Sequence, residues 1–249
     1  MARDTKKIIY SALPALLLVI IMWAVKLYEV TSGYYLYRFG LLPHSIEHLT
    51  GILFYPFIHG DLEHLYSNTI PFLILGAGMV FFYGKLSFRV FLLIFFLSGI
   101  GLWIGGRQTF HIGASGLVYG MASFLFFSGV LRRDVRLMAI SLIVTFLYGS
   151  MVWGVFPIVQ GVSWEGHLFG ALSGLVAAFG FRKDGPQKPK YMWEIEEEMQ
   201  EEMQKEEKKY WEEFYDRDPA NKDRPSPPTN INYVYKPKEN DSSDERKKD

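Results

Sequence analysis

One serine and one histidine stand in surroundings that suit nucleophilic catalysis. Ser115 is flanked by Gly113 and Gly116 in a Gly-Ala-Ser-Gly segment, where glycine permits a tight turn and close backbone approach. A serine at a helix N-terminus has free backbone N–H groups and the positive end of the helix dipole beside it, as an oxyanion hole needs. A hydroxyl becomes a nucleophile when a base takes its proton, and neutral imidazole is the usual base. His167 is the candidate base.

Two further polar residues could stabilise an oxyanion. His64 and Asn68 are four residues apart, so a helix would place both on one face, and each side chain can donate a hydrogen bond. Each of these residues also has a structural explanation, such as a helix N-cap for the serine or a hydrogen bond between helices for the asparagine. The elements that carry them decide between the two interpretations.

These elements are long apolar runs. Six runs of about 17–20 residues are each long enough for about 30 Å of hydrocarbon, and we expect an all-α membrane protein with six transmembrane helices. The runs cover residues 8–25, 64–83, 88–104, 115–131, 137–156 and 162–181. The first lacks a small-residue cleavage site after it, and we interpret it as an uncleaved signal anchor. A soluble bundle of very apolar helices is the less favoured alternative.

The charged residues divide the chain into two parts. Among 249 residues, 26 are basic and 26 are acidic, so the net charge gives no indication of a nucleic-acid partner. Residues 1–181 carry 18 charged side chains and residues 182–249 carry 34, which indicates a membrane domain followed by a polar tail. The chain has no cysteine, which excludes disulfides, thiolate metal sites and cysteine nucleophiles.

Lysine and arginine indicate the orientation. With a cytoplasmic N-terminus, the inner connections hold eight of these residues and the outer connections hold three. The positive-inside rule then places both termini in the cytoplasm, and the arrangement suits a bacterial inner membrane. The outer connection over 29–63 contains an apolar piece, 52–58, that is too short to cross the bilayer, and we expect it to lie half-buried at the interface.

In this orientation four polar residues share one depth. At about 1.5 Å per residue, Ser115 and Asn68 lie about 24 Å, and His167 about 21 Å, above the inner ends of their helices. His64 lies one turn higher than Asn68. No aspartate shares this layer, so Ser115 and His167 would form a dyad.

Glycine spacing predicts which helices meet. Two runs carry glycines at a spacing of four residues: Gly116 and Gly120 in one, and Gly166, Gly170 and Gly174 in the other. Small residues at this spacing let membrane helices pack backbone to backbone. Such packing would bring Ser115 within reach of His167.

The ordered set of these residues resembles the rhomboid family of intramembrane serine proteases. The set comprises His59, His64 and Asn68, then Gly113-Ala114-Ser115-Gly116, then His167, Gly170 and Gly174. The resemblance covers about residues 8–181. It implies the six-helix rhomboid bundle in the lipid bilayer, with a water-filled cavity open to the outside and no metal or other cofactor.

The resemblance also implies roles for the site residues. Ser115 would be the nucleophile and His167 the general base. His64, Asn68 and the Ser115 backbone N–H would form the oxyanion hole, and Tyr119 would pack on the imidazole of the base. The substrates would be single-span membrane proteins, cut in or near the span.

Several positions near the site depart from the family pattern or extend it. Many members carry Trp-Arg in the first outer loop, whereas counting back from His59, which matches a structural histidine, leads to Thr50 and Gly51 here. Residues 55–57 would then anchor this loop. Glu165 has no counterpart, and we expect it to face outer water.

Substrate entry is also implied by the resemblance. The helix around Phe146 to Trp153 would be the side gate through which a substrate reaches the site.

Other functions remain as alternatives. A zinc protease would need His-Glu-x-x-His and an aspartyl protease two aspartates within the spans, and the sequence has neither. A metal transporter or channel, another polytopic transporter and a structural scaffold do not explain why Gly-Ala-Ser-Gly shares its depth with a histidine. A catalytically silent rhomboid-like binder of client transmembrane helices would tolerate loss of Ser115, which a protease would not.

The tail shows three compositions. Residues 182–190 have the Pro, Gly and Lys content of a linker, residues 191–216 have apolar residues at helical spacing, and residues 219–249 have the composition of a disordered segment. The helix is expected to be solvated, or to pair with a cytoplasmic partner or with itself.

Overall fold

The protein is α-helical in its computed structural model. The structure describes all residues except 1, 148–152, 159–160, 186–191 and 218–249. It divides into two units, Met1–Pro189 and Lys190–Asp249. In the described part of the chain, no strand accompanies the helices, and Leu41 pairs with His111 in one isolated antiparallel bridge.

The first unit contains seven α-helices and three 3-10 turns within the described ranges. In chain order they are α1 (Ala2–Ser32), η1 (Tyr37–Phe39), α2 (Gly51–Phe54), η2 (Tyr55–Phe57), α3 (Leu62–Tyr83), α4 (Leu86–Gly105), α5 (Ser115–Arg132), α6 (Val135–Leu147), η3 (Trp153–Val155) and α7 (Trp164–Gly180). The second unit contains α8 (Met192–Arg217), over the stretch where the sequence predicts a helix, and most of its described side chains are exposed.

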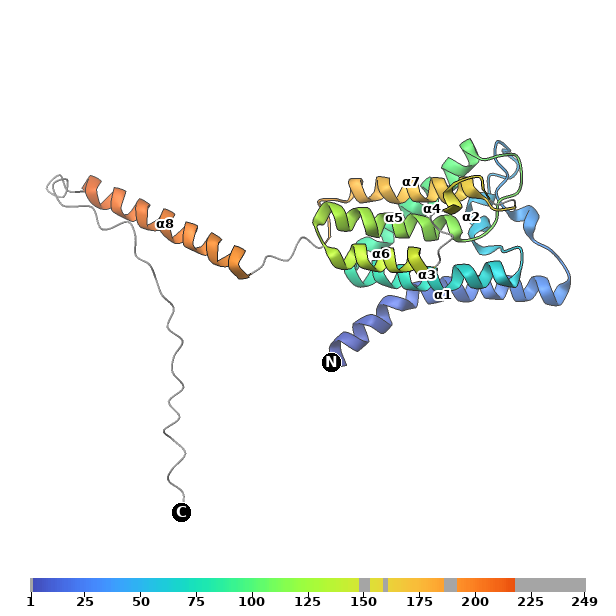
Figure 1. The fold of residues 1–249 in the computed structure, drawn as a ribbon, viewed down its shortest axis with the longest axis horizontal. Coiled ribbons are helices and arrows are strands. Elements are labelled where there is room, and N and C mark those ends of the chain that lie inside the picture. The colour runs from blue at the N-terminus through green and yellow to red at the C-terminus, as the bar shows by residue number, and fades with distance from the viewer. Residues whose placement is uncertain (1, 148–152, 159–160, 186–191, 218–249) are drawn as a thin grey trace, which may run out of the picture. The chain divides into compact units, whose positions relative to one another are not determined.

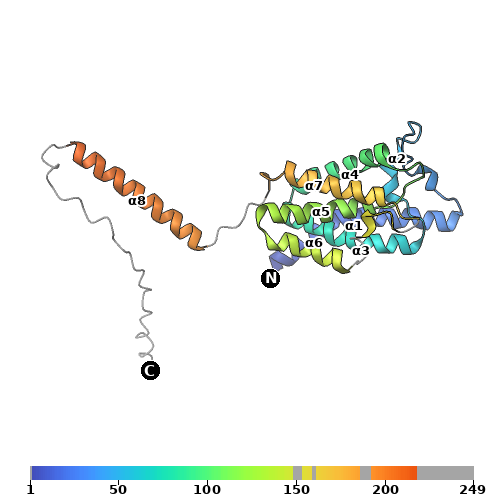
Figure 2. The same ribbon diagram turned by 45° about the horizontal axis from the view of Figure 1, so that its top comes forward.

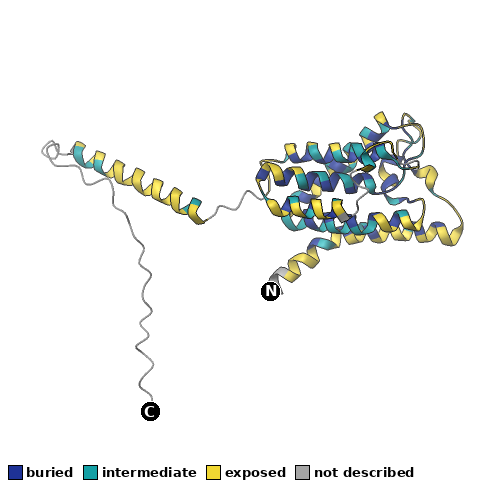
Figure 3. Cartoon of the chain, in the orientation of Figure 1, coloured by how far each residue is buried: buried dark blue, intermediate teal, exposed yellow. Residues whose placement is uncertain are grey.

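Helix α5 occupies the centre of the first unit. It lies between α7 and α6 in both views of the ribbon (Figures 1 and 2) and also contacts α3 and α4. In its apolar stretch 61% of the residues are buried, whereas in α1 the share is 22% (Figure 3). The residue at the start of α5 is therefore held by several neighbouring helices.

The contact between α5 and α7 is made by glycine, as the spacing predicts. A Cβ atom added at Gly170 would lie 2.1 Å from the carbonyl oxygen of Gly116, and one at Gly174 would lie 2.1 Å from that of Gly120. Both distances are far inside van der Waals contact and involve backbone atoms, which cannot rotate away. The two helices therefore pack backbone to backbone.

Four helices are long and apolar enough to cross a bilayer. They cover Thr5–Ser32, Leu62–Tyr83, Leu86–Gly105 and Ser115–Arg132. Helix α7 has 17 residues, and the apolar stretch described for α6 is Val135–Phe146. Multiple apolar helices of this length make the chain a multi-pass membrane protein.

Two of the predicted helices, the first and the fifth, differ most from the structure. Helix α1 extends to Ser32 rather than ending near Val25, because Lys26 is buried and bonded to Glu29 Oε2 (3.1 Å) and to the carbonyl oxygens of His59 (3.0 Å) and Gly60 (2.9 Å). Within the run predicted as one helix to residue 156, the structure describes α6 as far as Leu147 and a 3-10 turn, η3, over Trp153–Val155.

The connection between α1 and α3 is buried through some of its side chains and exposed through others. Ile52 and Tyr55 are buried, whereas Leu53 and Phe54 are about half exposed. The Tyr55 hydroxyl is 3.2 Å from Ser98 Oγ on α4, and the Tyr55 carbonyl accepts from the Gly113 N–H at 2.8 Å. Tyr55 thus ties this connection to the segment that precedes Ser115.

Candidate active site

Ser115 and His167 meet where α5 and α7 begin. Ser115 is the first residue of α5, and His167 lies in the first turn of α7. The Ser115 Oγ atom is 2.8 Å from His167 Nε2, and the histidine is 8% exposed. A hydroxyl and an imidazole nitrogen at hydrogen-bond distance can exchange a proton.

The imidazole ring of His167 has two further neighbours. The ring of Tyr119, one turn after Ser115, stacks on it with a centroid distance of 4.2 Å and an interplanar angle of 8°. The His167 Nδ1 atom is 2.9 Å from the carbonyl oxygen of Gly154 in η3. Contacts on a face and on both ring nitrogens hold the imidazole in one orientation.

His64 and Asn68 lie against the segment that leads into Ser115. Gly113 has a φ of 106°, a backbone conformation that residues with a side chain rarely adopt. A Cβ atom added there would lie 2.7 Å from His64 Nε2 and 3.8 Å from Asn68 Nδ2. The Asn68 amide donates one N–H to the carbonyl of His64 at 3.1 Å, and its second N–H is a further donor.

His59 also contacts the segment that leads into Ser115. It is 1% exposed, its Nε2 atom accepts from the Ala114 N–H at 3.4 Å, and its ring meets that of His64 edge to face at 5.0 Å. Burial lowers the pKa of His59 to about 3, so the ring is neutral at pH 7 and can accept from the backbone.

Acid is therefore expected to weaken the fold around His59. The unfolded histidine has a pKa of about 6.5, so the unfolded state binds the proton first and stability falls as the pH drops from there toward about 3, by up to about 1.4 kcal/mol per pH unit. Burial also lowers the pKa of His111, so this histidine adds to the loss of stability in acid. Thermal unfolding in detergent across this range tests the effect.

The control for this experiment is another histidine of the connection between α1 and α3. His59→Gln should flatten the decline with acid, whereas His48→Gln should leave it unchanged. An equally steep decline in wild type and His59→Gln would contradict the assignment.

Glu165 does not face outer water, contrary to the expectation from the sequence. It is 3% exposed and pairs with Arg107, whose Nε atom is 3.1 Å from Glu165 Oε1. Beside this pair, His111 Nδ1 is 2.6 Å from the hydroxyl of Ser163, the N-cap of α7. These two contacts join the segment before Ser115 to the start of α7, and the Glu165 carboxylate is buried for this reason.

Two contacts near the site were missed from the sequence. Gly154 reaches His167 through a backbone carbonyl, and Arg107 reaches Glu165 across 58 positions of the chain. Glycine and proline in residues 149–157 are turn signals that could have revealed η3. The proposed side gate, Phe146 to Trp153, lies for the most part outside the described residues, which omit 148–152.

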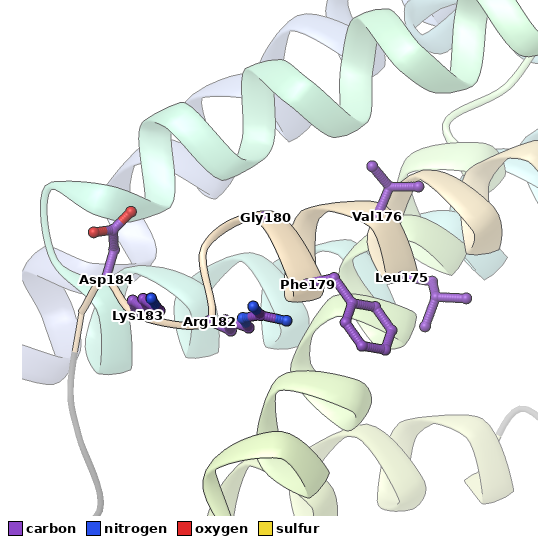
Figure 4. A pocket seen from close by; sticks show the side chains of 7 residues that line it. All are labelled: Leu175, Val176, Phe179, Gly180, Arg182, Lys183 and Asp184. Carbon is purple, nitrogen blue, oxygen red and sulfur yellow. The ribbon is translucent and has the colours of Figure 1, made fainter.

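A surface hollow of about 790 Å³ lies elsewhere, at the C-terminal end of α7 (Figure 4). Its lining consists of Leu175, Val176, Phe179, Gly180, Arg182, Lys183 and Asp184. None of these belongs to the predicted site, which lies at the opposite end of α7, so this hollow is not the place where Ser115 would meet a substrate.

One family model matches the chain, and uncharacterized mycobacterial proteins are similar to it in sequence. The family model of the Rhomboid domain matches residues 47–184, which is more than half of the chain. Uncharacterized proteins of Mycobacterium tuberculosis and Mycobacterium bovis are 37% identical over 175 residues, covering 65% of this chain and 71% of theirs. An uncharacterized protein of Mycobacterium leprae is 35% identical over 170 residues, covering 64% of this chain and 66% of its own.

Proposed function

The chain belongs to the rhomboid family, and from this premise we propose that it is an intramembrane serine endopeptidase with a Ser115–His167 dyad. The observation that carries the proposal is the 2.8 Å contact between Ser115 Oγ and His167 Nε2. The contact joins two helices packed through glycine, at the start of α5, where the Ser115 N–H has no partner within the helix.

The proposed reaction proceeds through an acyl-enzyme. Ser115 Oγ attacks the scissile carbonyl carbon while His167 Nε2 takes the hydroxyl proton. The tetrahedral intermediate collapses, the C–N bond breaks, and His167 returns the proton to the leaving amine. Water then attacks the acyl ester by the same two proton transfers, which releases the new carboxyl terminus and restores Ser115.

The oxyanion would be stabilised by donors from two helices. The Ser115 N–H lies at the start of α5, where the helix makes no use of it. The free N–H of Asn68 and the ring of His64 come from α3. Donors already in place cost no reorganisation when charge develops.

Asn68→Ala is expected to slow cleavage by about 10²–10³-fold, because the loss of one oxyanion donor typically has this effect. The rate of substrate cleavage under saturating substrate measures it. The control is Ser67→Ala, since the neighbouring Ser67 is exposed and its hydroxyl bonds only within its own helix among the contacts described, to the His64 carbonyl at 2.9 Å. Equal rates for Asn68→Ala and wild type would remove Asn68 from the site.

We further propose that the membrane domain crosses the bilayer six times. Helices α6 and α7 would complete the set with the four longer helices, both termini would be cytoplasmic, and the membrane would be a bacterial inner membrane. The charged tail over 182–249 would then be cytoplasmic, free to bind a partner or itself. The substrates would be single-span membrane proteins.

Cleavage in membranes tests the proposed function. Wild type and Ser115→Ala would each be expressed in cells with a set of single-span membrane proteins, and new N-termini within or beside the spans would be identified by mass spectrometry. The proposal expects cleavage that depends on Ser115. Client helices that co-purify equally with both variants, without cleavage, would instead indicate a binder.

A further inference from the structure

The turn η3 places a backbone carbonyl on the side of His167 that faces away from Ser115. The Gly154 carbonyl oxygen is 2.9 Å from His167 Nδ1, while Nε2 is 2.8 Å from Ser115 Oγ. A neutral imidazole has one N–H and one lone pair. Because a carbonyl only accepts, the hydrogen on the ring must be on Nδ1, and Nε2 is left with the lone pair that a base needs.

We propose that Gly154 is a positioning residue, whose carbonyl fixes the tautomer and the orientation of His167. The proposal rests on the function proposed above and extends the dyad by a third, backbone member. Its part corresponds to that of the carboxylate in a Ser-His-Asp triad, which holds the imidazole in the correct tautomer. A neutral carbonyl does so without burying another charge.

The alternative partner for Nδ1 is the nearest carboxylate, that of Glu165, and neither of its oxygens bonds to the ring. Glu165 is two residues before His167 on α7, yet its Oε1 atom pairs with Arg107 at 3.1 Å, and within the described part of the chain its Oε2 atom is buried without a hydrogen bond. Among the described residues, the ring nitrogens of His167 have hydrogen bonds only to Gly154 and Ser115. The carbonyl therefore takes the place that an aspartate would have in a triad.

The structure also accounts for glycine at position 154. A Cβ atom there would lie 2.0 Å from the Tyr119 hydroxyl oxygen, 3.1 Å from Tyr119 Cζ and 3.0 Å from His167 Nδ1. Tyr119 cannot turn aside without leaving its stack on the imidazole. A side chain at this position would push η3 away and take the carbonyl out of reach of Nδ1.

Two variants separate this role from simple packing. Gly154→Ala introduces the clash, and Gly154→Ala with Tyr119→Phe removes the hydroxyl oxygen that causes its shortest contact. Tyr119→Phe alone is the reference for the double variant. We expect Gly154→Ala to label with a fluorophosphonate about 10²-fold more slowly, in the rate of the covalent step rather than in the affinity for the probe, because a misplacement of a catalytic group by about 1 Å can have this effect. The double variant should regain most of this loss relative to Tyr119→Phe.

A spectroscopic readout tests the tautomer without reference to activity. The ¹⁵N chemical shifts of histidine side chains in detergent distinguish an N–H on Nδ1 from one on Nε2. The chain has six histidines, and His167 is assigned by the signal that His167→Ala removes. We expect the Nδ1–H form in wild type and a mixture of both forms in Gly154→Ala.

The outcomes distinguish the inference from the function on which it rests. An Nε2–H tautomer in folded wild type, or unchanged labelling in folded Gly154→Ala, would overturn the role of Gly154. Wild type that shows the Nδ1–H form but never labels would contradict the proposed protease instead. If Gly154→Ala fails to fold, replacing Val155 by its hydroxy acid turns the Gly154 carbonyl into a weaker ester acceptor without adding bulk. Labelling by this ester variant should then be slowed, and unchanged labelling would overturn the proposal.

Discussion

His167→Ala is expected to lower the rate of substrate cleavage by at least about 10³-fold while leaving the protein folded. The imidazole nitrogen Nε2, 2.8 Å from Ser115 Oγ, is the proposed acceptor of the hydroxyl proton, and the variant lacks it. Removal of a triad member typically lowers the rate by several orders of magnitude. Ser115→Ala should lose about as much, and the double variant should be little worse, since two residues that act as a unit do not contribute additively. Cleavage of one identified substrate by the four proteins in detergent measures this.

The controls for this prediction concern folding and neighbouring histidines. His167→Ala should still unfold in one cooperative thermal transition, although at a lower temperature than wild type, because the buried imidazole stacks on Tyr119 and bonds to Gly154 and Ser115. His48→Gln, in the connection between α1 and α3, should retain wild-type cleavage. Substantial cleavage by purified His167→Ala would mean that another group activates Ser115.

Gly170→Val is expected to have the largest effect on stability. The Cβ of any residue at 170 would lie 2.1 Å from the Gly116 carbonyl oxygen, so α5 and α7 would have to move apart. Overpacking of a close-packed core typically costs about 1–3 kcal/mol, and here the clashing atoms are backbone, so we expect the upper end of this range or more. The separation would also pull Ser115 from His167, and activity should fall in the fraction that remains folded.

Gly180→Ala on the same helix is the matched control. A Cβ added at Gly180 would meet nothing within 4 Å, so this variant should unfold like wild type or slightly later, since alanine is the better helix former. Unfolding of the set in increasing concentrations of denaturing detergent, followed by tryptophan fluorescence, measures the difference. Gly170→Val as stable as Gly180→Ala would show that the helices are not packed through this contact.

Much of the site follows from depth and spacing along the chain. Ser115 and His167 are 52 positions apart, but the glycines at intervals of four on both helices already predict a close contact. This pattern repeats with the period of the helix, so sequence alone could locate it. The place of Tyr119 beside the imidazole was implied instead by the resemblance to the rhomboid family.

Other features depend on contacts that no local pattern encodes. Every residue has the same backbone carbonyl, whatever its side chain. Nothing in the sequence therefore marks Gly154 as the partner of His167. The burial of Glu165 depends on Arg107 from a distant loop, and the length of α1 depends on carbonyls that bond Lys26. Glu165 was expected in water because its partner lies far away in sequence.

Covalent labelling with a fluorophosphonate tests the central claim most directly. Wild type, Ser115→Ala and His167→Ala would be purified in detergent, shown to be folded and treated with the probe, and the modified peptide would be identified by mass spectrometry. The dyad predicts one adduct, on Ser115, that forms in wild type and in neither variant. A folded wild-type protein that carries no adduct on Ser115, or a His167→Ala variant that labels as fast as wild type, would contradict it.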